Sequence, residues 1–122
     1  MNQFKLPLCL LIGVVFLTTI SFTQPVGYSF GKQILINDAQ VSGTTDFADF
    51  VMLVSFTDND LRTTANAGHV ENANGYDIIF TLADCNTLLD HQIEKYDAAT
   101  GEYLAWVKVP LLLSTANTNI HM

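Results

Sequence analysis

The stretch that decides the fold reads NGYDIIF (74–80), DCNTLLDHQIEKYD (84–97) and AATGEYLAWVKVP (98–110). Its apolar, β-prone runs are separated by residues that favour turns, such as Asn74-Gly75 and Gly101. These runs contain no pattern of residues typical of acid–base catalysis or metal binding. The stretch therefore predicts short strands joined by turns and indicates no particular chemistry.

Alternation along these runs predicts which side chains face the core, because successive side chains of a strand point to opposite sides. Strands are expected over 76–82 and 89–96, and a hairpin turn at 98–101 leads to a third over 102–109. Pro110 should end that strand, since proline cannot donate to a central ladder. The shared faces are Tyr76, Ile78, Phe80 and Leu82; Leu89, His91, Ile93 and Lys95; and Tyr103, Ala105, Val107 and Val109, opposite Leu104 and Trp106.

Two more strands are predicted upstream, over 33–36 and 47–56, with a loop at 40–46. The second strand carries apolar residues on both faces, which predicts a central strand covered on both sides or one packed under a loop. Those faces are Phe50, Met52, Val54 and Phe56 on one side and Val51 and Leu53 on the other. The segment 117–122 is expected to begin a final strand whose exposed edge invites pairing with another chain.

Six or so short strands at about ten-residue spacing, without a long helical period, predict an all-β fold, an antiparallel β-sandwich. We see no internal repeat and no second domain in the sequence. One β-sandwich domain is therefore expected over residues 25–122.

The N-terminus has the composition of a signal peptide, which we place at residues 1–24. Lys5 precedes an apolar run over 6–17, and small or polar residues follow it. The run is shorter than the about 20 apolar residues of a membrane-spanning helix; an uncleaved anchor is the alternative. Cys9 lies inside the run rather than at its end, which argues against a lipoprotein. We expect a secreted or cell-surface protein with no transmembrane span after cleavage.

Charge argues against two classes of partner. The chain has 12 acidic and 5 basic residues, a formal net charge of −7, and loss of Lys5 with the signal peptide lowers it to −8. Nucleic acid and anionic lipid both require clustered Lys and Arg, so neither is an expected partner. Cys85 is then the only cysteine left. We expect a buried or turn-flanking thiol rather than a nucleophile, because the sequence places no histidine and acid beside it.

The carboxylates lack the spacing of a glycosidase. A retaining enzyme needs two carboxyl groups about 5–5.5 Å apart. Asp90 and Glu94 share a predicted face, but four residues of strand separate them by about 13 Å. Glu94 and Asp97 point to opposite sides of a regular strand. No catalytic residue is therefore assigned, and we do not expect an enzyme.

Metal sites are equally weak in the sequence. Asp58-Asn59-Asp60 resembles part of a calcium loop, but it lacks the glycine at position six and the glutamate at position twelve. A cap on a single helical turn over 61–64, or an exposed turn, is the favoured interpretation. Calcium at a sandwich edge, through Asp77 or Asp84, stays open; otherwise no cofactor is expected.

The remaining candidates are histidines and aromatic residues. His69, His91 and His121 are scattered, and we expect His91 to be half-buried on its strand. Tyr103 and Trp106 have the side chains that stack on sugar rings. The tight alternation of Trp106 with Val107 favours a core position for the tryptophan.

Over residues 28–122 the chain resembles the bacterial and archaeal surface-protein family catalogued as domain of unknown function 2341. The most specific segments are NGYDIIF (74–80), LLDHQIEKYD (88–97), TGEYLAWVKVP (100–110) and TNIHM (118–122). Tyr28, Lys32 and Ile34-Leu35-Ile36 fill the family's opening pattern. Members usually continue into a Tyr-Tyr-Gly segment, so the chain is expected to be truncated or to end within its last strand.

The resemblance implies a concanavalin-like or jelly-roll sandwich that neighbours laminin-G-like modules in large exported proteins. It supplies no catalytic or ligand-binding residues. It implies a non-catalytic module for cell-surface adhesion, or for recognition of an extracellular glycan or protein. A structural spacer in a larger multidomain surface protein is the first alternative, and a polysaccharide-acting enzyme is the second.

Overall fold

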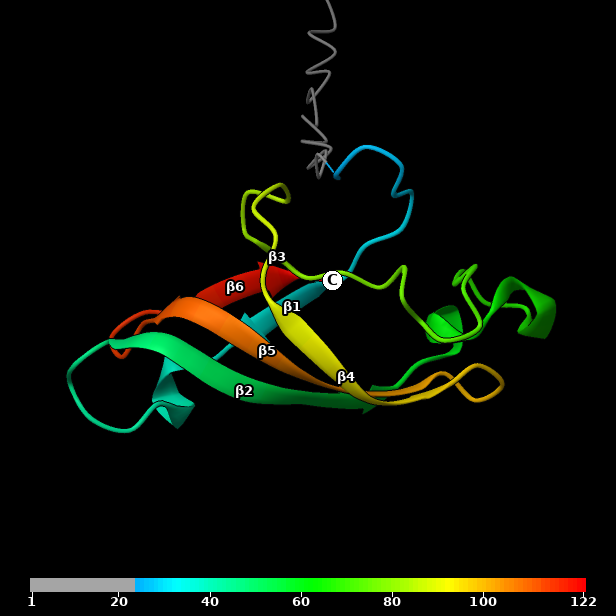
Figure 1. The fold of residues 1–122 in the computed structure, drawn as a ribbon. Coiled ribbons are helices and arrows are strands. Elements are labelled where there is room, and N and C mark those ends of the chain that lie inside the picture. The colour runs from blue at the N-terminus through cyan, green and yellow to red at the C-terminus, as the bar shows by residue number, and fades with distance from the viewer. Residues whose placement is uncertain (1–23) are drawn as a thin grey trace, which may run out of the picture.

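The computed structural model describes residues 24–122, and within them it is all-β (Figure 1). Two three-stranded antiparallel sheets have the strand orders β1-β6-β3 and β2-β5-β4. The strands are β1 (Gln33–Ile36), β2 (Phe47–Thr57), β3 (Thr81–Leu82), β4 (His91–Asp97), β5 (Glu102–Leu112) and β6 (Thr118–His121), with 3-10 turns η1 (Asp38–Gln40), η2 (Asn59–Leu61) and η3 (Thr64–Asn66). The predicted antiparallel β-sandwich is confirmed. The signal-peptide assignment falls on residues outside the described range, except for Gln24.

The core is built around one face of β5, the middle strand of its sheet. The predicted inward residues of this strand are all fully buried: Tyr103, Ala105, Val107 and Val109. Two further side chains are fully buried: Ile120 in β6 of the other sheet, and Phe80, which directly precedes β3. The period-2 pattern of 102–109 was therefore sufficient to identify the face that holds the two sheets together.

The expectation that β2 is a covered, central strand is wrong. β2 pairs with β5 alone and forms an edge of its sheet. Val54 on its inner face is buried, whereas Val51 and Leu53 on its outer face are exposed. Apolar residues on both faces thus do not mean two covered faces here, because no described segment packs over the outer side of this sheet.

Pro110 does not end its strand, contrary to the sequence prediction, since β5 continues to Leu112. The Lys108 N–H donates to the Asp90 carbonyl, and backbone N–H groups alternate in direction along a strand. Residue 110 therefore turns its nitrogen to the β4 side. There it has no β4 residue opposite it, because β4 begins at His91, which lies opposite Val107. Proline is tolerated because that position has no ladder bond to lose.

The predicted strand over 76–82 shortens to the two residues of β3. Gly75 has φ +72°, and its carbonyl accepts from the Ile78 N–H, so the chain turns before it joins the sheet. Ile78 and Phe80 are buried as predicted, but Tyr76 is 72% exposed. This segment is held by its side chains rather than by a ladder.

In β4 the predicted position of Lys95 is wrong. The pairing shifts between Ile93 and Lys95, so Glu94 is an extra, bulged residue. Lys95 then lies opposite Leu104 on the outer side and forms an ion pair with Glu102 at 2.7 Å. One inserted residue reverses the face of every side chain after it.

The last strand is also placed differently from the prediction of an exposed edge. β6 lies between β1 and β3 and is paired on both sides. Ile120 is fully buried. The strand is thus the central strand of its sheet. The expectation that it pairs with another chain is wrong, because both of its edges are already paired within the chain.

Candidate functional site

A large cleft lies between the segment 24–33, the loop over 60–79 and the end of β6. Its volume is about 630 Å³, within the range of small-molecule sites. The blue segment that leads into β1 arches away from the sheets and returns beside them (Figure 1). Apolar side chains such as Ile78 and Phe30 make up much of the lining.

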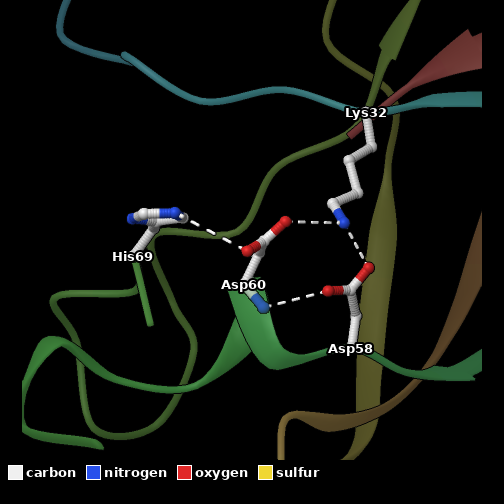
Figure 2. A network of polar contacts seen from close by, with 4 residues as sticks. All are labelled: Lys32, Asp58, Asp60 and His69. Carbon is white, nitrogen blue, oxygen red and sulfur yellow. Dashed lines mark hydrogen bonds and ion pairs between the residues drawn. The ribbon is translucent and has the colours of Figure 1, made fainter. Parts of the chain in front are cut away.

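A network of charged side chains ties the N-terminal segment to the loop after β2 (Figure 2). The Lys32 ammonium group donates to Asp58 and lies 2.9 Å from an Asp60 carboxylate oxygen. Asp60 is in turn 3.7 Å from His69 Nε2, and the His69 ring stacks on Phe30 with centroids 3.8 Å apart. The network closes one side of the cleft with side chains from segments far apart in sequence.

The same contacts explain two pKa shifts and settle the role of Asp58. Its carboxylate accepts from Lys32 and from the Asp60 N–H, which lowers the pKa of Asp58. The bond to Asp58, together with the one to Asp60, raises the pKa of Lys32. Asp58 caps η2, as the sequence predicted, although the turn covers Asn59–Leu61 rather than 61–64.

Cys85 has a histidine beside it, contrary to the sequence prediction. Its sulfur contacts Nδ1 of His121, and both residues line the large cleft. Cys85 is buried and sits in a turn, as expected for the thiol itself. Sequence reasoning missed the partner because His121 lies 36 residues away, and pairing of β3 with β6 is what brings it to the turn.

A second candidate site lies on the outer face of the β2-β5-β4 sheet. Trp106, expected in the core, is 41% exposed there. Trp106 and Val107 do point to opposite sides of the sheet, but Val107 is the buried one and Trp106 lies on the outer, partly exposed side. Trp106 lies opposite Leu53 of β2 and opposite Gln92 of β4, so it stands at the centre of a row across the sheet.

The adjacent row on this face is mixed in character. Lys108 lies opposite the exposed Val51 and beside Asp90, and its ammonium group is 3.3 Å from an Asp49 oxygen. A shallow hollow of about 280 Å³ opens over these rows, and its lining includes Trp106, Gln92 and Lys108. We call the set Val51, Leu53, Asp90, Gln92, Trp106 and Lys108 the Trp106 face.

The other sequence candidates have structural roles. Asp77 accepts from the N–H groups of Glu71 and Asn72, and Asp84 from those of Asn86 and Thr87. Hydrogen bonds from Thr100 and Ala99 lower the pKa of Asp97, which fixes the hairpin turn. These carboxylates organise their own loops.

The histidines are not gathered into one site. His91 is half-buried, as predicted, with its ring edge-on to Phe80 at 5.2 Å between centroids. His69 lies in the charged network and His121 beside Cys85. Within residues 24–122 no group of three or more His, Cys, Asp and Glu side chains could hold a metal ion.

Comparison with protein-family models gives a match over the C-terminal part of the chain. Residues 74–122 match the family model described as "Domain of unknown function (DUF2341)". No curated protein and no solved structure matches the chain. In the described part of the chain, no helix has the length and apolar character needed to cross a membrane.

Proposed function

We propose a function from the geometry, because the DUF2341 model that residues 74–122 match is described only as a domain of unknown function. The protein acts as a non-catalytic recognition module that binds a neutral extracellular polysaccharide on the Trp106 face. The observation that carries this proposal is the exposure of Trp106 at the centre of a sheet face. An indole ring with one open face is the surface on which the C–H side of a sugar ring packs.

The neighbours of Trp106 suit such a ligand. Gln92 and Asp90 offer hydrogen-bonding groups to ring hydroxyls on one side, while Val51 and Leu53 extend the apolar surface on the other. The hollow is shallow and lies across the strands, which suits a chain that passes over the sheet rather than a molecule held in a pocket. The net charge of −7 disfavours acidic polysaccharides, and the Lys108 ammonium group is already paired with Asp49.

Export is part of the proposal and rests on the N-terminal sequence. A chain with a signal peptide at residues 1–24 should lose it on secretion. Sequencing the N-terminus of secreted protein should place the cut between Ser21 and Gln24. An intact N-terminus on membrane-bound protein would support the uncleaved anchor instead.

Binding can be measured directly, because Trp106 is the only tryptophan of the chain. We expect saturable quenching or enhancement of its fluorescence by at least one member of a panel of soluble neutral glucans, mannans and xylans. Trp106→Ala should weaken binding by about 5- to 150-fold, since stacking on an aromatic side chain is worth about 1–3 kcal/mol where it has been measured for bases. Binding of variants that lack the fluorophore is followed by polysaccharide pull-down.

Tyr76→Ala is the matched control, because it removes an exposed aromatic ring that lies outside the Trp106 face. Binding that survives Trp106→Ala in the folded protein would refute this site. An absence of binding across the panel would favour the structural spacer. Hydrolysis of a bound polysaccharide that Asp90→Asn or Glu94→Gln abolishes would support an enzyme.

A further inference from the structure

The contact between Cys85 and His121 lies in the large cleft, apart from the Trp106 face, and the proposed function does not use it. A thiol in contact with an imidazole nitrogen is the arrangement that activates sulfur nucleophiles. Both groups line a cleft of about 630 Å³.

The backbone presents the thiol rigidly. Cys85 has φ +55°, a left-handed conformation that costs a non-glycine residue about 1 kcal/mol or more and must be imposed by its surroundings. The Asp84 carboxylate imposes it by accepting from the N–H groups of Asn86 and Thr87 and from the Thr87 hydroxyl. The Cys85 N–H itself donates to the Leu82 carbonyl.

The imidazole is held equally firmly from the opposite side. His121 lies in β6, where it is paired with Gln33 of β1 and with Thr81 of β3. Two strands therefore fix the backbone that carries the base, while a capped turn fixes the backbone that carries the thiol. The contact does not depend on a mobile loop on either side.

The surroundings of Cys85 distinguish between the reactions of a thiolate. Acyl transfer needs preorganised N–H donors for the oxyanion. The N–H groups of Cys85, Asn86 and Thr87 are all engaged in the turn, so none of these three is available to an oxyanion. Thiol–disulfide exchange needs only a thiolate, access to it and a proton for the departing thiol.

We propose that Cys85 and His121 form a site for covalent capture of low-molecular-weight disulfides. With Nδ1 as the unprotonated ring nitrogen, His121 takes the proton of the Cys85 thiol. The Cys85 sulfur attacks one sulfur of a disulfide RSSR, so that a new S–S bond forms as the old one breaks. The departing RS⁻ receives the proton from His121 and leaves as RSH. One disulfide is consumed and one is formed, and no other oxidant is needed.

The product is a mixed disulfide that persists. Cys85 is the only cysteine among the described residues, so no second thiol there can resolve it. The cleft volume matches a small molecule rather than a folded protein. Capture is therefore a single, reversible modification of the chain and not a catalytic turnover.

The experiment uses the whole chain with Cys9→Ser in every sample, so that Cys85 is the only thiol. Cystamine is the probe, because this small cationic disulfide is not repelled by an acidic protein. The modified fraction is measured by intact mass at pH 7.5 over time. The folded chain should react at least about tenfold faster than the same chain unfolded in urea, since a positioned base contributes about 10²–10⁴-fold to proton transfer. Dithiothreitol should restore the original mass.

His121→Gln should slow the folded reaction at least about tenfold, while His91→Gln, which alters a strand histidine outside the cleft, should leave it unchanged. A folded rate equal to or below the unfolded rate would overturn the proposal. So would an unchanged rate in folded His121→Gln. If His121→Gln does not fold by circular dichroism, the ratio of folded to unfolded rates decides alone.

Discussion

Replacing Phe80 by alanine tests how the segment before β3 is held. Phe80 has no exposed surface, and its ring lies 6.1 Å from that of Tyr103 and 5.2 Å from that of His91. The residues from Tyr76 to Phe80 lie outside any strand, so burial of this ring and of Ile78 is the main anchor of the segment.

The magnitude follows from the buried area. A phenylalanine buries about 200 Å², which at about 25 cal/mol per Å² is worth about 5 kcal/mol for the whole residue. Alanine keeps a small part of that, and the cavity adds a further cost, so we expect a loss of about 3–5 kcal/mol. A domain of this size has a free energy of unfolding of about 5–15 kcal/mol. The variant should therefore lose at least about a fifth of its stability.

Urea unfolding followed by circular dichroism measures the change. Tyr76→Ala is the matched control: the sequence pattern assigned Tyr76 to the same buried face, but it is 72% exposed. Its effect should stay within about 0.5 kcal/mol. Equal losses for Tyr76→Ala and Phe80→Ala would refute the reasoning, because they would mean that 76–82 is a regular strand with one buried face.

Four further predictions concern the turn, the charged network and, in two cases, the buried Tyr103. Gly101→Ala should cost about 2 kcal/mol or more in urea unfolding, because a Cβ would lie 1.9 Å from the Asp58 carbonyl oxygen; Gly43→Ala, also at positive φ but with open space around it, should cost less, and equal losses would contradict the steric argument. The lowered pKa of Asp58 stabilises the fold above the ordinary carboxyl pKa, and this contribution is lost as the pH falls through the lowered value; Asp58→Asn should therefore flatten the decline of Tm between about pH 5 and pH 2, and an unchanged slope would count against the network. Burial raises the pKa of Tyr103 to about 12, so its phenol should ionise near that pH in a spectrophotometric titration, and titration near 10 in the folded protein would show that it is not buried. Tyr103→Phe should change stability by no more than about 1 kcal/mol, since the hydroxyl has no hydrogen-bond partner among the described residues and its loss leaves the ring in place; a larger loss would show that the hydroxyl is bonded.

Local sequence patterns predicted turns, caps and the buried face of a strand, but they did not predict bulges or where a strand begins. The turn at 98–101, the cap at Asp58 and the inward face of β5 depend on neighbouring residues, and all three are confirmed. The position of Lys95 failed because a bulge at Glu94 leaves no mark in a period-2 pattern. The segment 76–82 failed as a strand because a turn from Gly75 overrode a regular alternation.

The sites were less accessible to sequence reasoning. The sequence predicted that Trp106 lies on a strand. Its exposure depends on whether another layer covers that side of the sheet, and the alternation of residues along one strand carries no information about this. Lys108 and Gln92 follow from the same alternation once the outer face is known. His121 could be recognised as a possible partner of Cys85 only from the pairing of β6 with β3.

The sequence by itself determined the all-β class, the turns, the buried side of β5 and the match of residues 74–122 to the DUF2341 model, because each is encoded in short-range order along the chain. Only the tertiary structure decided that β2 is an edge, that β6 is central and that Trp106 is exposed. Strand order and layer coverage are set by contacts between residues far apart in the sequence. They depend on the total burial that the two sheets achieve together, so no local pattern contains them.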